Sequence, residues 1–231
     1  MHLPPLTEGR LIKRYKRFLA DVELASGGVT TVHCPNPGSL MGLKEPGMRV
    51  WMSTSDNPKR KLPMTLELVE ADGGLVSINT NNPNKLAEEA IRSGKIEELA
   101  GFETLRREVN YSTNSRIDIL LETGETKTYV EVKNCHLMRT PGLTEFPDSV
   151  TSRGTKHLND LIRERKAGNR AVMLFIIQRT DCEALATAPD IDPDYHEAFY
   201  KAAEAGVEIL CYDCQISLEE ISVRRRIPWR R

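Results

Sequence analysis

Two acidic residues and a lysine between positions 118 and 133 have the types and spacing for metal-assisted hydrolysis. Asp118 interrupts the apolar run Arg116–Leu121, and Glu131 and Lys133 alternate with valines in Tyr129–Lys133. Residues two apart in a strand share a face, so Glu131 and Lys133 point the same way. If the two runs pair as a hairpin, Asp118 lies beside Glu131.

Neighbouring carboxylates repel each other, and each is costly to keep ionised without a cation. A hard divalent ion with oxygen ligands, such as Mg²⁺, removes that conflict between Asp118 and Glu131. Lys133 can then orient a water molecule or stabilise developing negative charge. The alternative interpretation of the same pattern is a solvated strand face on which Glu and Lys alternate.

Composition indicates a packed protein of one large or two small domains, because the 231 residues are 39% hydrophobic and 28% charged. Apolar runs are too short to cross a bilayer, and residues 1–18 lack a signal-peptide core, so we expect a cytoplasmic protein with no membrane partner. The odd number of cysteines, five, favours reduced thiols. Cys211 and Cys214 have ligand-like spacing, but alternation along a strand explains Cys211 without zinc.

Basic residues cluster on a chain whose formal net charge is only −1, which indicates local phosphate contact. The alternative is that each cluster is a solvated loop or tail. The expected nucleic-acid contacts are Arg14, Lys16, Arg17, Lys59, Arg60 and Lys61, together with Arg153 and Lys156 at a predicted helix start; the C-terminal cluster holds Arg224, Arg225, Arg226, Arg230 and Arg231.

The N-terminal part predicts a small β-barrel. Strand-like runs occur at Phe18–Leu24, Val29–His33, Arg49–Ser53, Met64–Val69 and Leu75–Asn79, with turn residues between them. Five short strands in under a hundred residues favour an OB-fold-like domain over residues 1–81, a fold that binds single strands by basic grooves and aromatic stacking. Tyr15, Phe18 and Trp51 are the available aromatic residues, and we expect Phe18 to belong to the barrel core.

The remainder, residues 82–231, predicts an α+β domain. Helical spacing covers Pro83–Gly94, Ser152–Lys166 and Pro193–Ala205, and strand patterns cover Thr104–Tyr111, Arg116–Leu121, Tyr129–Lys133, Ala171–Ile177 and Val207–Tyr212. Pro141–Pro147 is expected to be a loop. This order suits a mixed sheet flanked by helices. Glu89 has apolar neighbours on the first helix, so we expect it near the core.

The Asp118, Glu131 and Lys133 pattern resembles the PD-(D/E)XK nuclease-like superfamily, and the order of elements resembles the αβββαβ core of its restriction-endonuclease-like fold. Nearly the whole chain also resembles the sugar fermentation stimulation protein A family. The segments that carry this resemblance are Leu11–Asp21, His33–Asn36 with Gly38 and Ser39, Asn57–Lys61, Ile78–Thr80, Ser115–Asp118, Val130–Asn134, Phe146–Thr151, Arg153, Gly154 and Lys156–Leu158, and Ala205–Glu208.

The resemblance implies an OB-fold, a nuclease-like domain, DNA binding and a role in regulating sugar (maltose) metabolism. It assigns Asp118, Glu131 and the carbonyl of Val132 to a Mg²⁺ or Mn²⁺ ion, Lys133 to the attacking water, and Glu89 to the completion of a catalytic site. Pro37 departs from the family pattern, which has threonine there, so this chain lacks any contact that the threonine hydroxyl makes.

Three functions follow as hypotheses. The first is a DNA-binding metal-dependent phosphodiesterase, with single-stranded DNA or RNA left open as the substrate. The second is a non-enzymatic, sequence-nonspecific DNA-binding regulator for which the nuclease-like fold is only a scaffold. The third is a metabolite-binding enzyme, which the basic clusters disfavour. Analogy with other proteins of these folds allows a homodimer.

Overall fold

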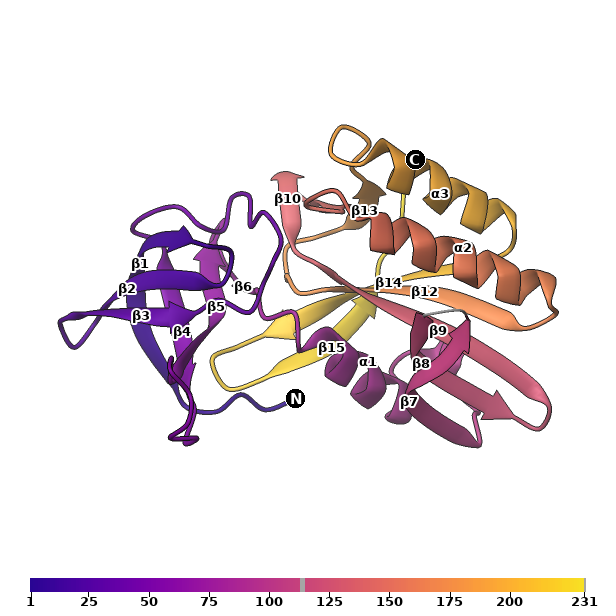
Figure 1. The fold of residues 1–231 in the computed structure, drawn as a ribbon, viewed down its shortest axis with the longest axis horizontal. Coiled ribbons are helices and arrows are strands. Elements are labelled where there is room, and N and C mark those ends of the chain that lie inside the picture. The colour runs from indigo at the N-terminus through magenta and orange to yellow at the C-terminus, as the bar shows by residue number, and fades with distance from the viewer. Residues whose placement is uncertain (113–114, 231) are drawn as a thin grey trace.

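The computed structural model describes residues 1–112 and 115–230, which form two domains side by side (Figure 1). The first is a β-barrel and the second a mixed α/β domain. The elements of the barrel domain are β1 (Leu6–Tyr15), β2 (Leu19–Leu24), β3 (Val29–His33), β4 (Arg49–Thr54), β5 (Met64–Ala71) and β6 (Gly74–Ser77).

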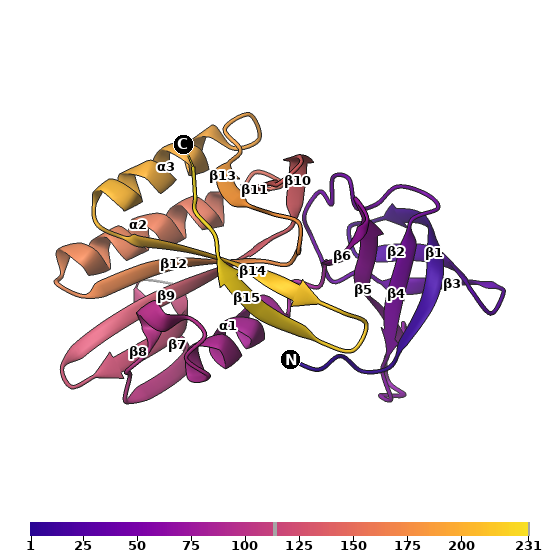
Figure 2. The same ribbon diagram turned by 180° about the vertical axis from the view of Figure 1, so that it is seen from behind.

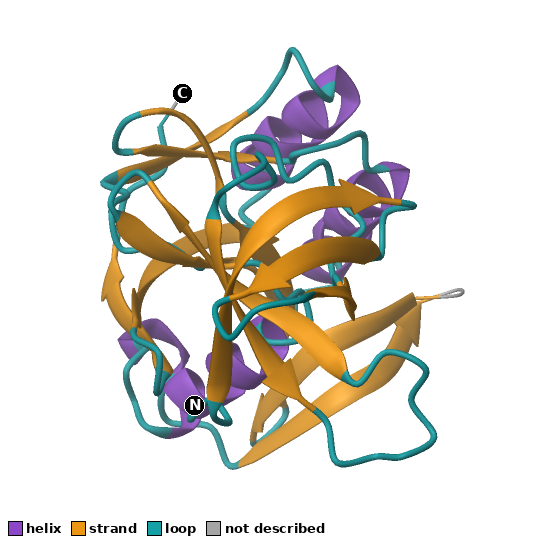
Figure 3. Cartoon of the chain, turned by 90° about the vertical axis from the view of Figure 1, so that its left-hand side faces the viewer, coloured by secondary structure: helices purple, strands orange, loops and turns teal. Residues whose placement is uncertain are grey.

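Strands β1 to β5 close the barrel, and β6 extends it beside β5. The strand order is β3-β2-β1-β4-β5-β6, and an additional pairing of β3 with β5 joins the two ends of the five-stranded part. The barrel faces the viewer in Figure 3. Strand β1 was not predicted from the sequence, because the basic residues at its outward positions were interpreted only as a phosphate-binding cluster. Gly9 and Leu11 are its buried residues.

The second domain is built on a six-stranded mixed sheet of order β15-β14-β12-β9-β8-β7. Helix α1 covers one face, and α2 and α3 cover the other (Figures 1 and 2). Its elements are α1 (Pro83–Arg92), the 3₁₀ turn Glu97–Leu99, β7 (Thr104–Ser112), β8 (Ser115–Thr123), β9 (Thr126–Cys135), β10 (Leu137–Thr140), β11 (Leu143–Phe146), α2 (Ser152–Lys166), β12 (Arg170–Ile177), β13 (Ala184–Thr187), α3 (Pro193–Glu204), β14 (Glu208–Ile216) and β15 (Ile221–Arg226).

The segment 141–147 is not a loop throughout, which corrects the expectation from sequence. It contains β11, the middle strand of a three-stranded sheet of order β10-β11-β13. Only four residues pair there, so the strand pattern is too short to recognise in a single sequence. The peptide bond between Phe146 and Pro147 is cis.

Apolar side chains join the two domains. Trp51 and Leu68 of the barrel belong to the same buried cluster as α1 and one face of the large sheet, whereas a separate cluster fills the barrel. Main-chain hydrogen bonds add to this contact, such as that from Ser77 N to Gln178 O at 3.1 Å. Phe18 does not belong to the barrel core: it is 45% exposed, at a turn that places its ring against His33.

All five cysteines are buried and free, and Cys211 lies in β14 as its alternation predicts. Within residues 1–112 and 115–230, none of the helices has the length and apolar character that a bilayer crossing requires.

Candidate functional site

The sheet opens between β8 and β9 at the first candidate residue, Asp118. The antiparallel ladder runs from Thr123 opposite Thr126 to Ile119 opposite Val130. At the next position, Asp118 Oδ2 accepts a hydrogen bond from the backbone N–H of Val132 at 2.8 Å, in place of a main-chain carbonyl. The N–H and C=O of one strand residue point to the same side, so the Val132 carbonyl also faces this opening.

Helix α1 contributes Asn84 to the site, not Glu89. Asn84 Nδ2 donates to Asp118 Oδ1 at 2.9 Å. The expectation that Glu89 lies near the core and completes the site is wrong, because its side chain is 55% exposed and pairs with the amino group of Met1 at 2.8 Å. Glu88 pairs with Arg92 instead. One helical turn separates Asn84 from Glu88, so the helix face toward Asp118 is the one that begins at Asn84.

Glu131 is the most buried group of the site, at 2% exposure. Its Oε1 accepts a hydrogen bond from Lys133 Nζ at 2.6 Å and another from His157 Nδ1 of α2. Its second oxygen, Oε2, is buried and has no hydrogen-bond partner among the described residues. An unpaired buried carboxylate oxygen is costly, so this atom is available for a ligand.

The tautomer of His157 follows from its neighbour Arg153. Arg153 Nε lies 3.2 Å from His157 Nε2, and a guanidinium N–H can only donate. Nε2 therefore accepts, and the ring proton is on Nδ1, where it is donated to Glu131. Lys133 Nζ lies 3.2 Å from the same Nδ1 but donates to Glu131 Oε1. Arg153 thus fixes the imidazole that holds the carboxylate.

The two carboxylates titrate in opposite directions. Burial raises the pKa of Asp118, and the charge of Glu131 raises it further. Burial also acts to raise the pKa of Glu131, but the Lys133 ammonium and the His157 N–H outweigh it and hold that pKa below its usual range. Asp118 is therefore the carboxylate whose charge still lacks compensation.

A cationic cavity of about 520 Å³ adjoins this cluster. Arg116 of β8 and Arg153, Lys156 and His157 of α2 contribute to its wall, so the first turns of α2 do carry cations as the sequence predicts. Ser115 Oγ and Lys156 Nζ both donate to Asp160, a fully buried carboxylate, at 2.6 and 3.2 Å. This contact holds β8 against α2.

The oxygen donors of the site suit a hard divalent ion. They comprise Asp118, the free Oε2 of Glu131 and the carbonyl of Val132, and Mg²⁺ in proteins is commonly held by one or two carboxylates with water in the remaining positions. Across the described ranges there is no group of three His, Cys, Asp or Glu side chains arranged to hold a metal. A metal here would therefore rely on main-chain oxygen and water.

The other basic clusters lie on the barrel domain. Arg14 Nη2 donates to the carbonyls of Asn36 and Gly38 at 2.7 and 2.9 Å, so it supports a loop of its own domain. Lys16 and Arg17 are exposed in the turn between β1 and β2, and Lys59, Arg60 and Lys61 are exposed between β4 and β5.

Three of the C-terminal arginines, Arg224, Arg225 and Arg226, are not part of a solvated tail. Arg224 and Arg225 lie in β15 and pair with Asp213, which is fully buried. Arg226 pairs with Glu98 at 2.7 Å. Arg231 lies outside the described residues. These ion pairs stabilise the edge of the large sheet. The clustering of arginines in the sequence did not predict this structural role.

Asn84 and His157 are the residues of the site that sequence reasoning did not assign. Asn84 begins the first turn of α1, and His157 follows Arg153 by four residues on α2, a spacing that places the two on one helix face. That spacing could have indicated that His157 lies beside Arg153. No comparable pattern exists for Asn84, because its contact with Asp118 depends on how α1 packs against β8.

A closed barrel joined to a mixed α/β domain with a carboxylate–lysine–histidine cluster defines a two-domain class of protein. Comparison of the sequence with known protein families identifies this class. Family models described as "SfsA N-terminal OB domain" and "Sugar fermentation stimulation protein RE domain" match residues 12–78 and 81–220. The chain belongs to the sugar fermentation stimulation protein family.

Similar proteins cover almost the full length. The sugar fermentation stimulation protein homolog of Maricaulis maris is 56% identical over 221 residues, which is 95% of this chain and 94% of that protein. The homolog of Brucella ovis is 52% identical over 225 residues, 97% and 94% of the two chains. The structure of Pyrococcus furiosus SfsA in complex with Ca²⁺ has a TM-score of 0.90 and 26% identity, and covers 100% of this chain and 98% of that one.

Proposed function

We propose that the protein is a metal-dependent phosphodiesterase that acts on nucleic acid, with Asp118, Glu131 and Lys133 as its catalytic residues. The observation that carries this proposal is the position of His157. Its Nδ1 contacts Glu131, and its ring also lines the cationic cavity with Arg153 and Lys156. A phosphate bound in that cavity lies next to the carboxylate–lysine cluster.

Asp118, Glu131 and the carbonyl of Val132 would hold a Mg²⁺ or Mn²⁺ ion. Such an ion would polarise the phosphate and lower the pKa of a bound water, which makes hydroxide available at neutral pH. The Pyrococcus furiosus relative in complex with Ca²⁺ supports a divalent cation that prefers oxygen ligands.

The chain's own residues supply position and charge. Lys133 Nζ forms an ion pair with Glu131 Oε1 at 2.6 Å. This pair places the ammonium group on the same carboxylate as the free oxygen, Oε2. There it can orient the attacking water and stabilise the charge that develops on phosphate. Arg153 and Lys156 bind the phosphate backbone, and the exposed lysines and arginines of the barrel add contacts that do not depend on sequence.

The name of the relatives links the family to sugar fermentation, and we propose that this nucleic-acid activity serves the control of sugar metabolism. The name identifies no substrate. The candidate substrates are single- and double-stranded DNA and RNA, and the first assay therefore includes all four.

The test is cleavage of labelled DNA and RNA with Mg²⁺ or Mn²⁺ by wild type, Lys133→Ala and Lys127→Ala. Lys127 lies at the exposed start of the same strand, β9, and serves as the matched control. We expect cleavage to require metal, to fall about 100-fold or more in Lys133→Ala, and to be unchanged in Lys127→Ala. Calorimetry should show metal binding that disappears in Asp118→Ala.

Binding of nucleic acid without cleavage in either metal would contradict this proposal and favour the non-enzymatic regulator. One observation favours that second function, namely that Oε1 of Glu131 is already bonded to both Lys133 and His157. In that case Asp118→Ala would leave nucleic-acid affinity unchanged.

A further inference from the structure

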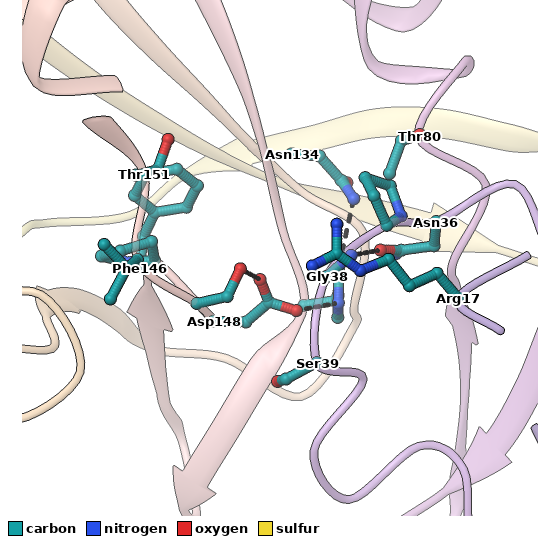
Figure 4. A pocket seen from close by; sticks show the side chains of 14 residues that line it. Arg17, Asn36, Gly38, Ser39, Thr80, Asn134, Phe146, Asp148 and Thr151 are labelled. Carbon is teal, nitrogen blue, oxygen red and sulfur yellow. Dashed lines mark hydrogen bonds and ion pairs between the residues drawn. The ribbon is translucent and has the colours of Figure 1, made fainter. Parts of the chain in front are cut away.

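A second cavity, of about 700 Å³, lies between the two domains. The barrel domain contributes Arg17, the segment 36–39 and Thr80, and the α/β domain contributes Asn134, His136 and the segment 146–151 (Figure 4). Small-molecule sites are commonly of roughly 300–1,000 Å³ and often lie at domain interfaces. Pro37, the departure from the family pattern, is in this wall.

The wall on the barrel side is rigid. Asn36 Oδ1 accepts from Gly38 N at 2.8 Å, and its Nδ2 donates to Ile78 O at 2.9 Å, so its side chain ties the loop to the end of β6. Arg14 holds the carbonyls of the same loop. A Cβ at Gly38 would overlap with the Asp148 carboxylate, so the absence of a side chain allows the two domains to approach. The barrel-side wall of the cavity is thus held by the protein's own contacts.

A chain of hydrogen bonds fixes the tautomer of His136. Gln178 Nε2 donates to the main-chain carbonyl of Asn79 at 3.4 Å and to Asn134 Oδ1 at 2.6 Å. Asn134 therefore presents its Nδ2 donor to His136 Nδ1, 3.1 Å away. Nδ1 accepts, so the ring proton is on Nε2.

That Nε2–H has no close acceptor among the described residues, although His136 is only 5% exposed. The nearest carboxylate oxygen, Asp148 Oδ2, lies 3.5 Å away, beyond an ordinary N–H···O bond. Burial acts to raise the pKa of Asp148, but His136, the Leu40 N–H and Ser149 outweigh it, and the net pKa is lowered. The cavity therefore offers one imidazole donor and one ionised carboxylate side by side.

Arg17 supplies the opposite charge. Its guanidinium extends from the β1–β2 turn into the cavity, toward Gly38 (Figure 4). Within residues 1–112 and 115–230, no ion pair of Arg17 with an acidic side chain is found. A guanidinium with five donors in a fixed fork matches a phosphate group.

We propose that this interdomain cavity binds a ribonucleotide, either free or as the 3′-terminal unit of an RNA strand, with its phosphate on Arg17 and its sugar hydroxyls on Asp148 and His136. A carboxylate accepts hydrogen bonds from hydroxyls, and the imidazole N–H donates to a sugar or phosphate oxygen. An anion and hydroxyls on the ligand suit this wall because it offers a cation at one end and an acceptor at the other.

This site is separate from the proposed catalytic cluster. Both involve β9, but successive side chains of a strand point to opposite faces, so Asn134 lies on the face opposite to Lys133. The inference therefore does not depend on phosphodiesterase activity. Lys133→Ala is expected to retain nucleotide binding, which distinguishes the failure of one proposal from the failure of the other.

The experiment is calorimetric titration of the full chain without metal, using the four 5′-ribonucleoside monophosphates, ribose 5-phosphate, adenosine and inorganic phosphate. The variants are Arg17→Ala and Asp148→Asn, with Lys44→Ala as control, since Lys44 is an exposed lysine of the same domain outside the cavity. We expect mononucleotides to bind, adenosine to bind more weakly, and each cavity variant to weaken mononucleotide binding about 10-fold or more, as loss of charged hydrogen bonds does.

Competition with short single-stranded oligonucleotides identifies the source of the nucleotide. Displacement of the mononucleotide by RNA indicates the 3′-terminal unit of a strand, and no displacement indicates a free ribonucleotide. The proposal is overturned if no mononucleotide binds at millimolar concentration, if inorganic phosphate binds as tightly as the mononucleotides, or if Arg17→Ala and Asp148→Asn both bind like Lys44→Ala.

Discussion

Two buried histidines, His157 and His136, each face a carboxylate. His157 uses its Nδ1 for this contact, whereas His136 uses its Nε2. His157 donates from Nδ1 to Glu131 because Arg153 occupies its Nε2. His136 accepts at Nδ1 from Asn134 and leaves its Nε2–H 3.5 Å from Asp148. One imidazole is fully bonded by the protein, whereas the other retains a donor.

The difference separates a closed site from an open one. Around His157, the protein itself supplies a cation for Glu131, so the remaining unsatisfied atoms are carboxylate oxygens that suit a metal. Around His136, the carboxylate and the N–H are too far apart to satisfy each other, so both suit a ligand with hydroxyls. The same pair of residue types thus indicates two different ligands, and the neighbours of the ring decide which.

The largest effect expected from this comparison is on stability. Glu131→Ala leaves the Lys133 ammonium and the His157 N–H without a buried partner, and we expect it to lower the free energy of unfolding by about 3 kcal/mol. Asp148→Ala removes a longer contact, 3.5 Å from the His136 ring, and should cost about 1 kcal/mol. Urea denaturation measures both, with Lys127→Ala as a neutral control. Equal losses of unfolding free energy in the two variants would contradict the distinction between the closed site at His157 and the open site at His136.

A smaller effect concerns pH. The folded pKa of Asp118 is raised, so the folded state binds more protons than the unfolded state between the two pKa values, and stability falls as pH rises through this window. Asp118→Asn removes this loss. We expect the variant to gain stability relative to wild type as pH rises above about 4, the ordinary aspartate pKa, and to show no gain below it.

Denaturation curves across this pH range test the sign. Glu131 and Asp148 have lowered folded pKa values, so their contributions are present above their unfolded values and are lost as pH falls through the folded ones. A variant of Asp118 that lost stability relative to wild type with rising pH would show that its carboxylate is compensated in the folded protein.

The smallest effect is spectroscopic. Long-range ¹H–¹⁵N spectra should show His157 as the Nδ1–H tautomer and His136 as the Nε2–H tautomer. Arg153→Ala frees Nε2 of His157 and should change the signals of that ring alone. Identical tautomers in the wild-type protein would contradict the hydrogen-bond networks on which the comparison rests.

Much of the fold could be predicted from sequence because its patterns are local. The continuous apolar run 171–177 forms β12 in the centre of the large sheet, and the helical spacing of 152–166 matches α2 residue for residue. The basic outward face of β1 concealed a strand, and β11 was too short to stand out. In both cases pairing with neighbouring strands decides the structure, and local composition does not.

The site was predictable in part for the same reason. Alternation along one strand places Glu131 and Lys133 together, and Lys133 is indeed 2.6 Å from Glu131. The choice between Glu89 and Asn84 depends on how α1 is rotated against β8, which a single sequence does not determine. The interdomain cavity depends on the docking of two domains, and its residues lie as far apart as Arg17 and Thr151.

Strand β9 carries Lys133 on one face and Asn134 on the other, so a single peptide plane joins the two proposed sites. A ligand on either face that turns this plane moves both side chains, and thermodynamic linkage then requires each ligand to change the other's binding free energy by the same amount. Titration of the nucleotide with and without Mg²⁺ would measure this coupling energy.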